Sequence, residues 1–143
     1  MARVGASAQT QAMEAGDGAE QLSRALPREA LRLLAEHVHS IGELDLLMLL
    51  ADDRTRSWEV EEICDRLRCP RSWVERRLDA LAAAGLLAEG QGRYSCVPSS
   101  AELDAALEAI SDAHRTRLAQ LTAVIVSPRR RRRALAAVRG RRD

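Results

Sequence analysis

Five consecutive arginines near the end of the chain have the clearest chemistry in the sequence: Arg129, Arg130, Arg131, Arg132 and Arg133. Guanidinium groups bind phosphates and carboxylates through paired hydrogen bonds. Five neighbouring charges cannot be desolvated together, so we expect all of them to be exposed. Each one that contacts a nucleic-acid phosphate adds about 0.9 to the steepness of the salt dependence of binding. The run therefore predicts phosphate contacts, and the alternative is a disordered basic end that touches the acidic remainder of the chain.

Charge is divided unevenly along the sequence. Residues 128–143 hold eight arginines and one aspartate, a net charge of +7. The other 127 residues hold fourteen arginines and twenty acidic residues, a net charge of −6. This separation predicts that the arginine-rich tail, residues 128–143, binds a nucleic acid or an acidic protein. The apolar face behind its arginines is too small to favour a membrane surface, so we expect no membrane partner.

Cysteine and histidine could bind a metal or act as nucleophiles, but their spacing here favours neither role. Cys64, Cys69 and Cys96 are odd in number and show no paired spacing, which fits reduced thiols. Cys64 and Cys69 flank a predicted turn, so a thiol or metal switch stays an alternative, although no third ligand is evident. His37 and His39 point in different directions if they lie on a helix. We expect no metal and no cofactor.

Other catalytic motifs and targeting segments are equally scarce. The sequence has no glycine-rich phosphate loop, no nucleophile elbow and no histidine–carboxylate pair at catalytic spacing. No apolar run approaches the ~18 residues of a membrane span, and the first twenty residues lack the apolar stretch of a signal peptide. We therefore expect a cytoplasmic protein that is not an enzyme, and one associated with the nucleoid if its partner is DNA.

Helices must position most of these residues, because only three of the 143 residues are aromatic and Leu, Ala, Val and Ile have to form the core. Residues 1–21 are small, polar and without periodicity, which predicts disorder. Residues 22–40 contain a flanking helix that begins at Pro27, a residue suited to a first helical position. This helix places Leu31, Leu34 and Val38 on one face.

Residues 41–98 have the pattern of one compact domain. Ser40 and Glu43 have the spacing of a capping box, which predicts a helix from Ile41 that is apolar enough to lie in the middle of the fold. Two shorter helices follow, over residues 59–67 and 70–84, the second with its apolar residues Val74, Leu78 and Leu81 inward. Gly85 is the expected left-handed cap, and the glycines of residues 90–92 predict a hairpin between two extended runs.

This order of elements resembles the winged helix-turn-helix domain of MarR-like and ArsR-like bacterial transcription regulators. The segment RRLDALAAAGLLAEGQGRYSC carries the strongest local likeness, because a helix ends in a glycine cap and a glycine hairpin follows at once. In that family the helix after the turn lies in the major groove of DNA. The resemblance implies a DNA-binding regulator of transcription with double-stranded DNA as its partner.

The same resemblance assigns DNA contacts to particular positions. On the helix these are Arg71, Ser72, Trp73, Glu75 and Arg76, of which either arginine can pair with guanine. Arg93, just past the hairpin glycines, matches a wing residue that enters the minor groove. For each arginine the alternative is a solvated surface charge, and for Trp73 it is a place in the core beside Trp58.

Two features depart from the family pattern. Between residues 57 and 84 five arginines face six acidic residues, a net charge of −1, whereas a DNA-binding surface gains affinity from surplus positive charge. Arg77 occupies a position that is often apolar in the family. A winged helix that contacts a protein, as an adaptor on the transcription machinery or a co-regulator, is therefore the alternative function.

Residues 99–127 predict one long helix of about 40 Å that ends at Pro128. Its apolar stripe consists of Leu103, Leu107, Ile110, His114, Leu118, Leu121 and Ile125. Flanking helices build the dimer in MarR-like proteins, so the resemblance implies a homodimer formed through this stripe. The alternative is that the helix folds back over its own domain. The predicted fold is thus mostly α with a small β-hairpin: a winged helix-turn-helix domain, a flanking helix and a long C-terminal helix.

Overall fold

Helices and one small sheet make up the described part of the chain. The computed structural model describes residue 18 and residues 20–140, with only the backbone of residues 137–140. The elements in chain order are α2 (Arg28–His37), α3 (Ile41–Asp52), β1 (Trp58–Glu59), α4 (Val60–Leu67), α5 (Arg71–Ala83), β2 (Leu87–Gly90), β3 (Arg93–Cys96), α6 (Ala101–Thr116), α7 (Leu118–Val126) and α8 (Pro128–Gly140). The predicted class, mostly α with a little β, is confirmed. No helix within the described residues has both the length and the apolar character needed to cross a membrane.

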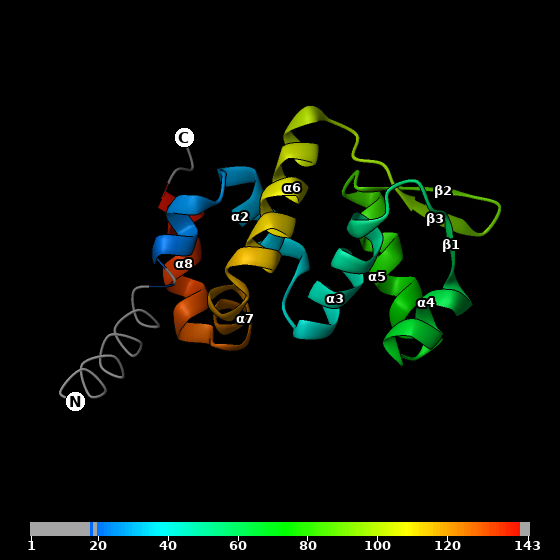
Figure 1. The fold of residues 1–143 in the computed structure, drawn as a ribbon, viewed down its shortest axis with the longest axis horizontal. Helices are drawn as coiled ribbons and strands as arrows, with labels where there is room; N and C mark the ends of the chain where they lie inside the picture. Colours follow the sequence, from blue (N-terminus) through cyan, green and yellow to red (C-terminus); the bar gives the residue numbers. More distant parts are fainter. Residues whose placement is uncertain (1–17, 19, 141–143) are drawn as a thin grey trace.

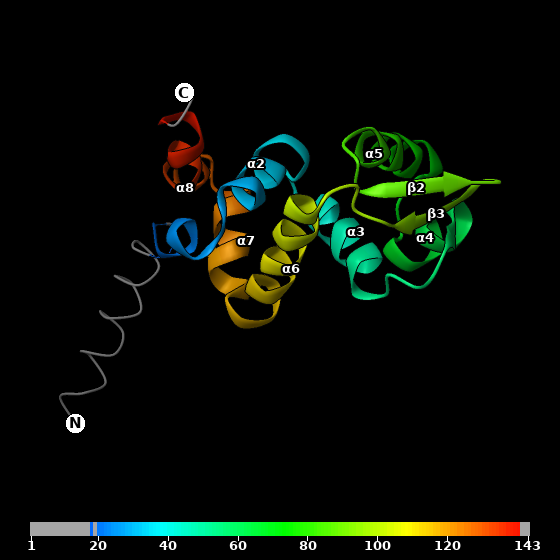
Figure 2. The same ribbon diagram turned by 90° about the horizontal axis from the view of Figure 1, so that it is seen from above.

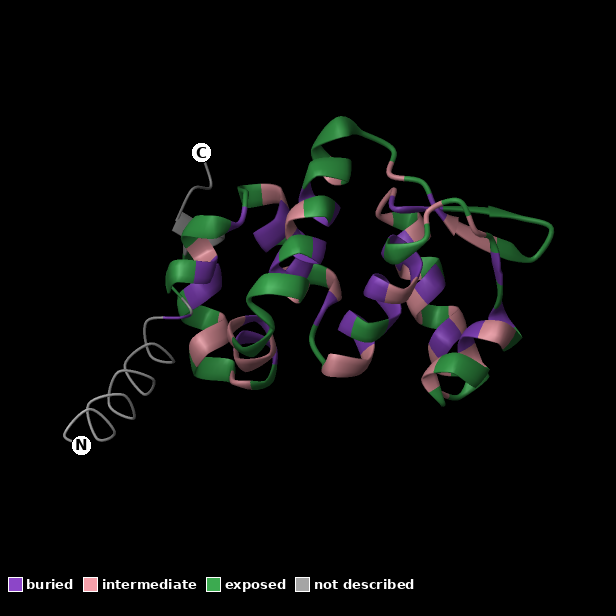
Figure 3. Cartoon of the chain, viewed as in Figure 1, coloured by how far each residue is buried: buried purple, intermediate pink, exposed green. Residues whose placement is uncertain are grey.

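The elements form two groups along the long axis of the molecule. α4, α5 and the sheet lie at one end, α2, α7 and α8 lie at the other, and α3 and α6 lie between them (Figures 1 and 2). The buried residues gather on the faces that the helices turn toward one another (Figure 3). Most of the predicted disordered segment 1–21 lies outside the described residues, but Gly18, Glu20 and Gln21 are helical, and the helical residues continue to residue 25.

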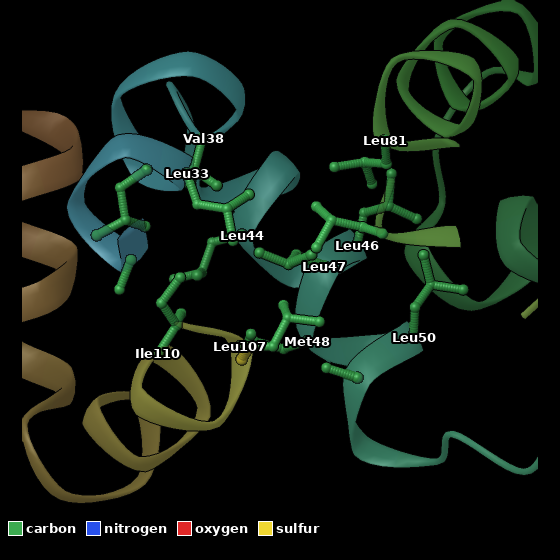
Figure 4. Close-up of a cluster of buried hydrophobic side chains, with 14 of the residues drawn as sticks. Leu33, Val38, Leu44, Leu46, Leu47, Met48, Leu50, Leu81, Leu107 and Ile110 are labelled. Atoms are coloured by element: carbon green, nitrogen blue, oxygen red, sulfur yellow. The ribbon is translucent and has the colours of Figure 1, made fainter. Parts of the chain in front are cut away.

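α3 lies in the middle of the core, as its apolar sequence predicted. Its side chains Leu44, Leu47 and Met48 are buried and meet side chains of α2 and α6 (Figure 4). The Ser40 hydroxyl caps the helix by accepting a hydrogen bond from the Glu43 N–H at 3.2 Å. In a capping box the Glu43 carboxylate would accept from the N–H of Ser40. Here it accepts from the N–H of the preceding residue, His39, at 2.6 Å.

The sheet has one strand more than predicted. β2 and β3 form the expected hairpin, and its two turn residues, Gln91 and Gly92, have φ values of 56° and 77°. Two consecutive positive φ values are characteristic of a type I′ turn, which matches the twist of a hairpin. β1 then pairs with the outer side of β3, with Trp58 opposite Tyr94, to give the strand order β1-β3-β2. β1 has only two residues, which is too short to show an alternating pattern, so the sequence did not predict it.

The single long helix predicted over residues 99–127 is wrong. The chain breaks at Arg117, whose φ of −135° and ψ of 39° are not helical, and α7 turns back to pack against α6, α8 and α3. A straight continuation would leave the apolar side chains of α7 in water, whereas the turn buries Leu121, Val124 and Ile125. Helical spacing on the two sides of a one-residue break is the same as in one continuous helix, so the pattern could not reveal it.

The apolar stripe predicted to form a dimer interface belongs mostly to the chain's own core. Leu107, Ile110, Leu121 and Ile125 are buried, Leu103 and His114 are half-buried, and Leu118 is 47% exposed. Of the two arrangements that the sequence left open, folding back over its own domain is the one observed. The homodimer stays a prediction, and the buried members of the stripe are not on the surface to form it.

Candidate nucleic-acid interface

The outer face of α5 is the first part of the candidate interface. Val74, Leu78 and Leu81 point into the core, as predicted, and therefore leave Ser72 and Arg76 on the exposed side of the helix. Within the described part of the chain, neither of these two side chains has a hydrogen bond or an ion pair. Both are free to contact a ligand.

Arg71, the first residue of α5, is held by two carboxylates of its own chain. Its Nε donates to Glu75 at 3.1 Å, and its Nη1 donates to Glu61 of α4. The Arg71 side chain is 57% exposed, and exposed ion pairs contribute about 1 kcal/mol or less. The pairs reduce the positive charge of this surface, but Arg71 can leave them for a phosphate at little cost.

Arg93 is the first residue of β3, directly after the hairpin turn, and is also paired with acidic residues. Its Nε donates to the Ser57 hydroxyl at 3.1 Å, and its two Nη atoms lie 3.5 and 3.9 Å from the carboxylates of Glu59 and Glu62. The Glu59 N–H donates to the Glu62 carboxylate, and this hydrogen bond lowers the pKa of Glu62. The carboxylate beside Arg93 is thus kept in its charged form.

Trp73 and Arg77 lie on the side of α5 that faces α3. The Arg77 guanidinium donates to the carboxylate of Glu43, which is only 8% exposed. The Trp73 indole lies 3.7 Å from the point that a Cβ on Gly42 would occupy. Trp73 is therefore packed against the core and is not part of the exposed face. The ion pair explains why a position that is often apolar in the resembled family holds an arginine here.

The arginine run forms part of α8 and is not wholly exposed, so this prediction is wrong. The guanidinium of Arg131 donates to the main-chain carbonyls of Val38 at 2.5 Å, of Ala35 at 3.2 Å and of Leu34. These carbonyls belong to the last turn of α2 and its cap residue Val38, where the helix dipole favours a cation. Burial lowers the pKa of Arg131. The helix turns one arginine of the five inward, and the three carbonyls compensate for its lost hydration.

The other four arginines of the run differ in their exposure. Arg129, Arg132 and Arg133 are exposed and Arg130 is half-buried, while Ala134 and Leu135 are buried. α8 lies at the opposite end of the molecule from α5 and the hairpin (Figures 1 and 2). The structure therefore does not bring the arginine run together with the residues predicted on α5 and β3.

Replacing Arg131 with methionine is expected to lower the free energy of unfolding by about 2 kcal/mol, because hydrogen bonds to a charged group are removed while the apolar stem is kept. Urea unfolding followed by circular dichroism measures the change. Arg132→Met is the matched control on the exposed side of the same helix, and we expect it to change stability by about 0.5 kcal/mol or less. Equal decreases in the two variants would show that Arg131 does not anchor α8.

The thiols and histidines are placed as follows. Cys64 and Cys69 are half-buried and Cys96 is buried, and all three are free. Burial raises the pKa of Cys64 and lowers the pKa of His37, while His39 is exposed beside the Glu43 carboxylate. Over residues 20–140 no group of three or more histidine, cysteine or acidic side chains is arranged to hold a metal ion.

Sequence reasoning missed the acidic partners of the arginines. Arg71 and Glu75 are four residues apart on one helix, a spacing that could have indicated their pair. The partners on other elements carry no such signal, because Glu43 lies 34 residues from Arg77, and Glu59 of β1 is far along the chain from Arg93 of β3. Only the folded chain brings them together.

No protein-family model, curated protein or solved structure matches this chain.

Proposed function

We propose that residues 41–98 form a winged helix-turn-helix domain that binds double-stranded DNA, with α5 in the major groove, and that the protein regulates transcription. The observation that carries this proposal is the first half of α5. It follows α4 after a tight turn, rests on a sheet with a type I′ hairpin, and exposes Arg71, Ser72 and Arg76 on one outer face. A helix held in this way can present its N-terminal side chains to base edges and phosphates.

The hairpin is the second contact in this proposal. Arg93 lies in the strand that follows the turn and is 44% exposed. A guanidinium beside the turn of a wing can contact a phosphate or enter a minor groove. Arg93 has to leave the carboxylates of Glu59 and Glu62 to do so, which again costs little for exposed pairs.

The acidic neighbours make the proposed DNA binding weak on its own. Glu61 and Glu75 hold Arg71 and place negative charge beside the phosphates that α5 would approach. Removal of like charge from such a surface raises affinity for DNA, because phosphate binding is governed by the net charge that meets it. The exposed arginines of α8 add phosphate contacts at a separate place, without sequence preference.

The double substitution Glu61→Gln, Glu75→Gln tests the proposal. We expect it to raise affinity for mixed-sequence duplex DNA at low salt by about fivefold, because it frees Arg71 and removes two charges that repel phosphate. Fluorescence anisotropy with a labelled duplex measures the change. The matched control, Glu102→Gln with Asp112→Asn, removes two exposed acids from α6.

The comparison of the two double variants decides the outcome. If the control raises affinity as much as the α5-side variant, binding follows net charge alone and α5 is not the contacting surface. If neither variant binds DNA, the proposal fails. The second candidate, a winged helix that contacts a protein of the transcription machinery, is then favoured, because α4 exposes Glu61 and Asp65 to a basic partner.

A further inference from the structure

The turn between α4 and α5 brings two cysteines together. Arg68 ends α4 in the left-handed conformation, with φ of 57°. The carbonyl of Cys64 accepts hydrogen bonds from the N–H of Arg68 at 2.8 Å and from the N–H of Cys69 at 3.3 Å. In such a helix ending, the residue after the left-handed residue frequently contacts the side chain of the residue four positions before the left-handed one; here these are Cys69 and Cys64.

The main-chain bond limits how far apart the two cysteines can be. With an N···O distance of 3.3 Å between Cys69 and Cys64, standard bond lengths keep their α-carbons within about 7 Å. A disulfide requires α-carbons at about 4.4–6.8 Å. Both side chains also pack against the same apolar core and are half-buried. The turn therefore keeps the α-carbons of the two cysteines close to the range that a disulfide spans.

We propose that Cys64 and Cys69 form a site of reversible oxidation, an intramolecular disulfide that links the last turn of α4 to the residue before α5. A low-molecular-weight disulfide such as oxidised glutathione is the oxidant. One cysteine thiolate attacks it, forms a mixed disulfide and releases one reduced glutathione. The second thiolate attacks the protein sulfur of that mixed disulfide and releases the other. One protein S–S bond forms, and the two thiol protons end on the two glutathione molecules.

The surroundings of the three thiols determine which thiol attacks first and which one stays reduced. Burial raises the pKa of Cys64, so Cys69 is the expected first attacker and Cys64 the resolving thiol. The Cys69 thiol lies 3.4 Å from the carbonyl of Leu67, near the end of α4. The third thiol, Cys96, is only 3% exposed, and burial raises its pKa too. It should stay reduced under mild oxidation, and the site does not depend on DNA binding.

Equilibration of the full chain with a glutathione redox buffer, followed by acid quenching, alkylation and trypsin, tests the proposal. Cleavage after arginine separates the two cysteines into peptides 57–66 and 69–71 and leaves Cys96 in peptide 94–115. We expect a disulfide that joins the first two peptides, while Cys96 is recovered alkylated. The ratio of oxidised to reduced pair should be at least about tenfold higher in the folded chain than in urea, because the turn holds the thiols together.

Two single substitutions, each of which removes one of the two cysteines, serve as controls. In Cys69→Ser no linked peptide can form, and Cys64 should remain alkylated or carry one glutathione. In Cys64→Ser the mixed disulfide on Cys69 should accumulate, because its resolving thiol is absent. If the unsubstituted chain instead carries one glutathione on each cysteine, or if urea does not change the ratio, the turn does not preorganise the pair and the proposal is overturned.

Discussion

Leu107→Glu is expected to unfold the protein. Leu107 is fully buried on α6 beside α3 (Figure 4), and its replacement removes a core side chain and places a carboxylate in an apolar site. The poorer packing alone costs about 3 kcal/mol or more, and burial of an unpaired charge adds to it. The sum takes a large share of the total stability of a small protein, which is about 5–15 kcal/mol. Disappearance of the helical circular dichroism signal at 25 °C measures the effect.

Leu118→Glu is the matched variant for that experiment. Leu118 was predicted on the same stripe, but it follows the break at Arg117 and is 47% exposed. We expect the variant to fold and to lose about 1 kcal/mol or less of stability. If both variants stay folded and only their oligomeric mass changes in light scattering, the stripe forms an interface between copies and its burial within one chain is contradicted.

Glu43→Ala is expected to lower the free energy of unfolding by about 3 kcal/mol, because it leaves the half-buried Arg77 without its partner. Glu43 of α3 is buried and accepts from Arg77 of α5 and from the N–H of His39 in the linker before α3. Removal of this carboxylate therefore leaves two donors unsatisfied. Urea unfolding of the single variant measures the decrease.

A double variant separates the ion pair from simple packing. Glu43→Leu with Arg77→Leu replaces both charges by apolar side chains, and such replacements are often neutral because no buried charge is left alone. We expect the double variant to be more stable than Glu43→Ala. Additive effects, in which the second substitution lowers stability further, would contradict a coupled pair.

Local signals predicted much of the fold. The Ser40 hydroxyl caps α3 as its spacing from Glu43 indicated, and the apolar positions of α5 point inward as their period required. Gly85 follows the end of α5 with φ of 87°, the left-handed conformation expected of a glycine cap. These features depend on residues within a few positions of one another, so a sequence contains them directly.

The predictions that failed concern features that depend on distant parts of the chain. The break at Arg117 follows from what α7 can bury when it turns back, and the spacing of its leucines does not contain that information. The inward turn of Arg131 requires the carbonyls of α2, almost a hundred residues earlier. Charge counting treated the five arginines as one group, whereas the helix gives each a different surrounding.

For the same reason, only those features of the candidate site that depend on nearby residues could be predicted from the sequence. The exposed positions Ser72 and Arg76 follow from helical period alone, because the opposite face of α5 is apolar. Most carboxylates that pair with Arg71 and Arg93 come from other elements. The sequence therefore showed only the net charge of residues 57–84, and not which arginines are paired with acidic residues.

The most direct test of the proposed DNA binding is the salt dependence of duplex affinity for the full chain and two charge-matched variants. Arg71→Ala with Arg76→Ala removes the proposed DNA-binding side chains, and Arg115→Ala with Arg117→Ala removes two exposed arginines around the end of α6. We expect the first pair to lower affinity at least about tenfold and to reduce the salt slope by about 0.9 for each phosphate that is no longer bound. The control pair should leave the slope unchanged. Equal decreases in both variants, or none in the first, would contradict the assignment of α5 as the DNA-binding helix.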